Sequence, residues 1–137
     1  MLLAFYAASW AAQVAVLLLA NALSGALNPA VQRELADARG IWRGQKEPLM
    51  LYPLLGAPLV SAIALHQLHA GLRLPSVAGD ARGACALAAA LWAVGPLHGL
   101  AVNFTSLKVS ALVTGHFALT TLACALVNGL LLAHFSA

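Results

Sequence analysis

Residues 1–32 read MLLAFYAASWAAQVAVLLLANALSGALNPAVQ and contain no Asp, Glu, Lys or Arg. Three further stretches, 48–72, 83–107 and 109–137, are equally free of these charged residues. Placing one Arg, Lys or Asp at the centre of a bilayer costs about 2.5–3.5 kcal/mol on insertion scales. Each stretch exceeds the ~20 residues that an α-helix needs to cross the hydrocarbon core. The sequence therefore predicts an all-α integral membrane bundle of four transmembrane helices.

We expect the spans at about 2–23, 48–72, 84–104 and 109–135, within a single membrane domain that occupies residues 1–137. Only 8% of the residues are charged, whereas soluble domains average about 25%. A soluble fold of this length could not cover its apolar surface with so few charges. A nucleic-acid partner is excluded as well, because the few basic residues cannot form a basic face.

The first loop, residues 24–47, predicts a short amphipathic helix at about 29–39 that lies on the membrane surface. Asn28 and Pro29 suit the N-cap and the first helical position, and Gly40 suits the end of the helix. Val31 and Leu35 face one way, while the charged residues of the segment face elsewhere. Such a pattern is typical of an interfacial helix.

The distribution of Lys and Arg predicts the orientation of the chain. The first and third loops share one side and hold five of these residues, whereas the second loop holds two. Because cytoplasmic loops carry the excess of basic residues, we expect the long loop in the cytoplasm and both termini outside. We expect the protein to reside in a bacterial inner (plasma) membrane.

Two spans contain residues that break helices. Pro53 and Pro58 surround Gly56 in the second span, so we expect a kink near Leu54–Pro58. The third span contains Gly95-Pro96-Leu97-His98-Gly99, which predicts a second kink together with a Gly-x-x-x-Gly face for close helix contact.

One face of the first span is polar. Tyr6, Ser9 and Gln13 follow one another at helical spacing, and Gln13 falls near the middle of the bilayer. A buried amide in lipid must be hydrogen-bonded, so we expect Gln13 to find a partner inside the bundle.

The sequence offers a possible haem b site at His98 and His116. They lie 10 residues before and 8 residues after Lys108, which places both about 12–15 Å from one membrane face. Equal depth on adjacent antiparallel helices is what axial ligation of a haem iron requires. The same matched depth would equally let the two residues share a proton or line a pore.

The remaining histidines fit a second haem less well, and a metal site is the alternative for them. His66 and His69 share a helical face, and His134 lies near the same end of the fourth span. Asp80 could complete this superficial site.

A transport path through the bundle interior would use Gln13, His98, Asn103, His116 and Thr120. The same groups could instead form hydrogen bonds that hold the helices together. No acidic or basic residue lies at mid-bilayer, which disfavours a proton-coupled antiporter that depends on a buried Glu.

Arg33, Arg39 and Arg43 could bind an anion at the cytoplasmic face. Length and the four-span plan with a long first loop are similar to the microsomal glutathione-transferase-like membrane enzymes, which bind glutathione with such loop arginines. The similarity lies in the plan alone, because no motif aligns and the third span lacks an arginine.

Three functions therefore remain open from the sequence. We favour a small oligomeric transport or channel protein, or an accessory subunit of a membrane complex. The alternatives are a haem b electron-transfer protein and a membrane enzyme that acts on a lipophilic substrate. No motif of soluble enzymes occurs, so we expect no enzyme activity of that kind. The expected partners are the lipid bilayer and further copies of the chain or other membrane subunits.

Overall fold

A computed structural model describes residues 1–37, 51–72, 79–106 and 110–136 of the chain. These residues are helical almost throughout, and no strand occurs among them, which confirms the all-α prediction. In chain order the elements are α1 (Leu2–Leu27), α2 (Pro29–Asp37), η3 (Tyr52–Gly56), α3 (Ala57–Leu72), α4 (Ala81–Trp92), η4 (Ala93–Leu97), α5 (His98–Ser106) and α6 (Ala111–Ser136), where η denotes a π-helical turn.

Four helical segments are long and apolar enough to cross a membrane: Leu2–Leu27, Tyr52–Leu72, Ala81–Phe104 and Ala111–Ser136. They coincide with the four predicted spans to within a few residues at most ends. Their outer surfaces are apolar, as Leu19 (60% exposed) and Leu119 (71% exposed) illustrate. Water-soluble monomers rarely expose large contiguous patches of this kind, so the surface fits a membrane protein.

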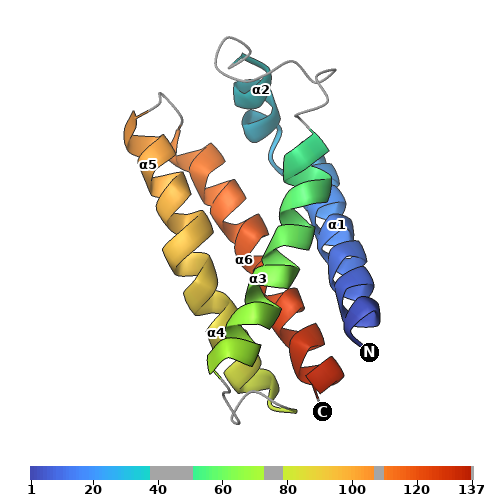
Figure 1. Cartoon of the computed structure of the whole chain (residues 1–137). Helices are drawn as coiled ribbons and strands as arrows, with labels where there is room; N and C mark the ends of the chain where they lie inside the picture. The colour runs from blue at the N-terminus through green and yellow to red at the C-terminus, as the bar shows by residue number, and fades with distance from the viewer. Residues whose placement is uncertain (38–50, 73–78, 107–109, 137) are drawn as a thin grey trace.

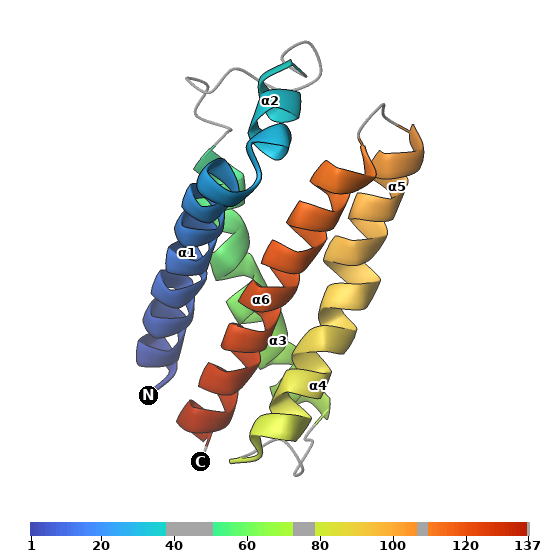
Figure 2. The same cartoon turned by 180° about the vertical axis from the view of Figure 1, so that it is seen from behind.

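Helix α6 organises the bundle. It packs against α1 on one side and α4 on another, while α3 packs mainly on α1 and touches α4 at only a few residues (Figures 1 and 2). Both termini lie at one end of the bundle, and α2 lies at the other end (Figure 1). This arrangement is the one that an even number of crossings requires.

The main core lies toward the end of the bundle that holds the termini. Phe5, Leu65 and Leu132 are almost fully buried there, and small residues of α4 fill the space between them. The ring of Phe5 meets the ring of Phe135 edge to face, with centroids 6.1 Å apart. Aromatic and aliphatic contacts therefore join α1, α3 and α6 at this end.

Helices α4 and α6 approach each other through small residues. Ala84 and Ala88 of α4 are buried, as is Gly129 of α6. A Cβ atom on Gly129 would lie 2.9 Å from the Ala84 carbonyl oxygen and 2.9 Å from the Cα atom of Cys85. Only glycine at position 129 permits this distance between the two backbones.

Helix α2 is docked on the bundle end. Val31, a residue of this helix, is only 1% exposed. The Glu34 carboxylate accepts hydrogen bonds from the backbone N–H of Ser110 (2.9 Å) and from the Ser110 hydroxyl (2.5 Å). Since Ser110 immediately precedes α6, a negative charge is placed at the positive end of that helix. The helix ends at Asp37 in the described residues, and the predicted end at Gly40 lies outside them.

Substituting Glu34→Gln should therefore loosen α2, because the amide removes the charge and one acceptor oxygen. We expect the docking of α2 to weaken by about 1–2 kcal/mol. Hydrogen exchange of the α2 amides measures this effect, and Asp37→Asn, at an exposed position of the same helix, is the matched control. Equal exchange rates in the two variants would show that Glu34 does not hold the helix.

Candidate functional site: the groove between α3 and α4

Two helix breaks define the walls of the site. Pro58 has no N–H to donate to the Leu54 carbonyl one turn back, and Pro96 has none for the carbonyl of Trp92. The chain forms a π-helical turn at each place, η3 before Pro58 and η4 around Pro96. At both places where the sequence predicts a kink, the structure shows a π-helical turn within a continuous helical span. Such turns occur frequently at functional sites.

Both breaks line the same groove. It has a volume of about 330 Å³ and lies between Tyr52 and Pro53 of η3 and Gly95 and Pro96 of η4. Further residues from α1, α3, α4 and α6 complete its lining. This volume is at the lower end of the range of about 300–1,000 Å³ that is usual for ligand pockets. The groove is therefore large enough for a small molecule.

Gln13 lies at the centre of a buried polar network beside the groove. Its side chain is 3% exposed. The amide nitrogen donates to the Ser9 hydroxyl (2.9 Å) and to the Pro58 carbonyl (3.2 Å), and the amide oxygen accepts from the Ser61 hydroxyl (2.7 Å). The expectation that Gln13 finds partners inside the bundle is confirmed, and the bonds tie α1 to α3.

The network continues to α6 through Ser9. The Ser9 hydroxyl donates to Oδ1 of Asn128 at 2.6 Å, and Asn128 is 3% exposed. One turn away, the Tyr6 hydroxyl lies 3.2 Å from Nδ1 of His66 on α3. The polar face predicted for the first span therefore points into the bundle along its whole length.

Two tryptophans are fixed beside the helix breaks. Trp92 donates its indole N–H to the Thr121 hydroxyl (2.9 Å), which in turn donates to the Phe117 carbonyl (2.8 Å). Trp10 donates to the Leu55 carbonyl of η3 at 2.8 Å. The side chains that line the groove include no Asp, Glu, Lys, Arg or His in the described part of the chain. The groove is thus neutral and mostly apolar, with amide and hydroxyl groups at its base.

The five residues expected to line a transport path are not brought together. Gln13 lines the groove. His116 and Thr120 line a different pocket, and His98 and Asn103 are exposed on the outer surface of α5. The groove instead uses Ser61, Asn128 and other residues that the sequence did not single out as a set.

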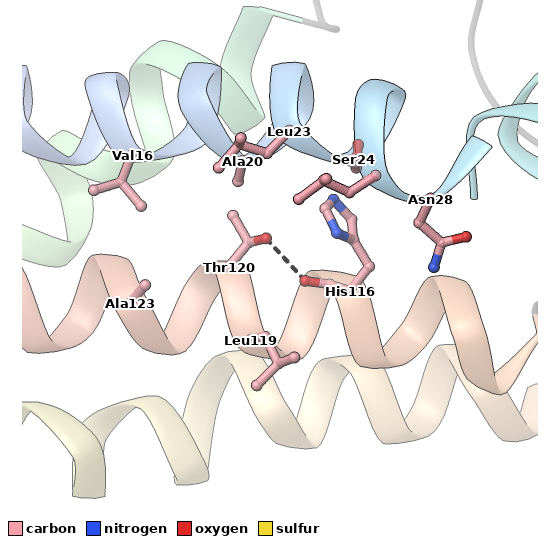
Figure 3. A pocket seen from close by; sticks show the side chains of 10 residues that line it. Val16, Ala20, Leu23, Ser24, Asn28, His116, Leu119, Thr120 and Ala123 are labelled. Atoms are coloured by element: carbon pink, nitrogen blue, oxygen red, sulfur yellow. Dashed lines mark hydrogen bonds between the residues drawn. The ribbon is translucent and has the colours of Figure 1, made fainter. Parts of the chain in front are cut away.

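The second pocket lies between α1 and α6 and has a volume of about 340 Å³ (Figure 3). Figure 3 shows the imidazole of His116 directed toward α1, close to Ser24. The Thr120 hydroxyl donates to the His116 carbonyl at 2.8 Å, so it is engaged within its own helix. The pocket is shallow and lined chiefly by aliphatic side chains.

The haem prediction gains no support from this placement. His116 faces the pocket beside α1, and His98 lines neither this pocket nor the groove. Lys108, from which the matched depth was counted, lies outside the described residues. Neither this pocket nor the groove contains both imidazoles.

The metal and anion predictions are not supported either. His66 is engaged by Tyr6, His134 is exposed, and no group of three His, Cys, Asp or Glu residues in the described ranges could hold a metal ion. The Asp80 carboxylate caps α4 by accepting hydrogen bonds from the backbone N–H groups of Arg82 and Gly83. Arg33 is exposed on α2, whereas Arg39 and Arg43 lie outside the described residues.

Comparisons with known protein families, with curated proteins and with solved structures found no match to this chain. The groove is therefore interpreted from its own geometry and chemistry. The signals for it that the sequence offered were the two proline-containing breaks and the polar face of the first span.

Proposed function

We propose that this chain is an integral membrane protein that binds a small molecule in the groove between α3 and α4. The ligand is neutral and lipophilic, and the protein moves it within or across the bilayer. The observation that supports this most strongly is that two π-helical turns line one groove beside a buried amide network. Such turns are frequent at functional sites. Irregular backbone within a membrane is tolerated where it lines a cavity.

The chemistry of the lining favours a neutral ligand. Burying an ion in an apolar site is very costly unless an opposite charge compensates it, and the groove supplies none. Apolar walls with a few polar groups are the usual composition of a small-molecule pocket. The ligand is therefore expected to partition into the membrane and to reach the groove from the lipid.

The packing of the bundle supports movement of the ligand. Helix α3 is tied to α1 by the Gln13 hydrogen bonds, while α4 is packed closely on α6. The few contacts between α3 and α4 can separate without disturbing either of these pairs. We expect the groove to widen and close by a small displacement of α3 and α4 relative to each other, while α1 stays packed on α6.

The exposed surface of α5 supports assembly into a homo-oligomer or a larger membrane complex. His98 and Asn103 are exposed there, although polar residues within spans normally face protein. A Cβ atom on Gly99 would meet nothing within 4 Å, so another helix has room to approach. We further propose the bacterial inner membrane as the location, with α2 on the cytoplasmic side and both termini outside.

The substitution Gly95→Phe tests the groove, because Gly95 lines it and the added ring has open space in front of it. We expect the affinity for a neutral lipophile, measured with tritiated fluorenone by scintillation proximity in nanodiscs, to fall at least about tenfold. Protein-free nanodiscs give the background from partition into lipid.

Gly99→Phe is the matched control, since it places the same ring on the same segment but outside the groove. It should bind fluorenone as the wild type does, and its oligomeric state tests the α5 surface independently. Wild-type affinity in both variants would exclude the groove as the binding site. Equal loss in both would place the ligand on the outer face of α5.

A further inference from the structure

Asn128 has an unused hydrogen-bond donor at the groove. Its side chain is 3% exposed and lines the groove, and its Oδ1 atom accepts from Ser9 at 2.6 Å. Its Nδ2 atom makes no hydrogen bond within the described chain. Among the fully buried side-chain nitrogen and oxygen atoms of the described ranges, only His69 Nδ1 has no hydrogen-bond partner. Asn128 Nδ2 has no partner either and is not in that class, so it is not fully buried. The nitrogen is therefore open to the groove.

The direction of the hydrogen bonds fixes which end of the Asn128 amide is free. Gln13 Nε2 donates to Ser9 Oγ, so the Ser9 hydrogen is available to donate to Asn128 Oδ1. An amide whose oxygen is held in this way presents its NH₂ group, which offers donors and no acceptor. The relay from α1 thus orients the amide on α6.

The other buried donors of the groove are already in use, whereas the Tyr52 hydroxyl belongs to a side chain that is 55% exposed at the rim. Both hydrogens of the Gln13 amide are directed to Ser9 and Pro58. The Trp92 N–H is bound by Thr121, and the Thr121 hydroxyl is directed to a backbone carbonyl. Among the buried donors, a ligand in the groove therefore meets one unpaired NH₂ group, that of Asn128, in an otherwise largely apolar lining.

We infer that the ligand of the groove bears a carbonyl oxygen that accepts a hydrogen bond from Asn128 Nδ2. This inference rests on the proposed function and names its substrate class: neutral lipophilic ketones, quinones or esters. An unsatisfied amide in a low-dielectric site is unfavourable, so a ligand that supplies an acceptor binds better than one that does not. A carbonyl supplies this acceptor without adding a donor that would itself need a partner.

Fluorenone and fluorene test the inference, because they are nearly identical tricyclic molecules that differ in a carbonyl and a methylene group. Wild-type protein in nanodiscs is expected to bind fluorenone about threefold to tenfold more tightly than fluorene, after correction for partition into lipid. The carbonyl stretching band of bound fluorenone should move to lower frequency than in lipid alone.

Asn128→Leu should bind the two molecules equally and return the carbonyl band to its position in lipid. Asn103→Leu is the matched control, since it makes the same change at an exposed position of α5 that does not line the groove. This variant should keep the preference for fluorenone and the shifted band.

Each result separates the inference from the function on which it rests. Equal affinities and an unshifted band in the wild type would overturn the carbonyl inference, while leaving the groove as a site for lipophiles. No saturable binding of either molecule would overturn the proposed function as well. A full preference retained in Asn128→Leu would show that another group holds the oxygen. If that variant does not fold, the wild-type band decides together with the preference for fluorenone, because a hydrogen bond lowers the carbonyl frequency and favours the ketone over fluorene.

Discussion

Replacing Gly129 with alanine is expected to destabilise the bundle by about 1–3 kcal/mol, the usual cost of overpacking a tight interface. The new methyl group would lie 2.9 Å from both the Ala84 carbonyl oxygen and the Cα atom of Cys85. Both are backbone atoms, so they cannot turn aside as a flexible side chain could. Helix α4 would have to move away from α6, and the other contacts along this interface would loosen with it. Larger residues at position 129 should prevent assembly of the two helices.

Gly115→Ala is the matched control for this prediction. Gly115 lies in the same helix, and a Cβ atom there would meet nothing within 4 Å. Alanine is favoured over glycine in helices by about 1 kcal/mol, so this variant should be neutral or slightly more stable. Unfolding by dodecyl sulfate in mixed micelles, followed by circular dichroism, measures both. Equal stability of the two variants would contradict the close contact between α4 and α6.

Gln13→Leu is expected to destabilise the protein by about 2 kcal/mol. The substitution removes three hydrogen bonds, one within α1 and two to α3, and a bond between membrane helices is worth about 0.6 kcal/mol on average. The cost stays moderate because the Ser61 hydroxyl can still donate to the Pro58 carbonyl. The same unfolding titration measures the loss.

Gln67→Leu supplies the control, because Gln67 is an exposed glutamine of α3. It should leave the stability nearly unchanged. A double-mutant cycle between Gln13→Leu and Ser61→Ala isolates their direct hydrogen bond, for which we expect a coupling of about 0.6 kcal/mol and at most about 1.7 kcal/mol. A coupling of zero would mean that the 2.7 Å contact contributes nothing to stability.

The architecture was largely predictable from the sequence, because exclusion of charge from lipid is a property of consecutive residues. The four charge-free stretches gave the long helices, and the prolines gave the two breaks. The differences lie mainly at the ends. Helix α1 continues to Leu27 rather than ending near residue 23, and α2 follows directly after Asn28.

The site was predictable only on the side of α1. The spacing of Tyr6, Ser9 and Gln13 showed that this face turns inward, but it could not show which residues would meet it. That choice depends on how each helix rotates about its axis, and close contacts such as that of Gly129 with α4 help to set it. Matched depth is likewise insufficient to pair His98 with His116, since rotation places them on different surfaces.

Photolabelling with benzophenone tests the central claim, that a neutral lipophile occupies the groove between the two π-helical turns. Benzophenone is a lipophilic ketone, and on irradiation it bonds to nearby C–H groups, which mass spectrometry can locate. Labels are expected on partly buried groove residues such as Leu17 and Leu91, and excess fluorenone should suppress them. Labels confined to outward-facing residues such as Leu18 and Leu130, without competition by fluorenone, would contradict the account.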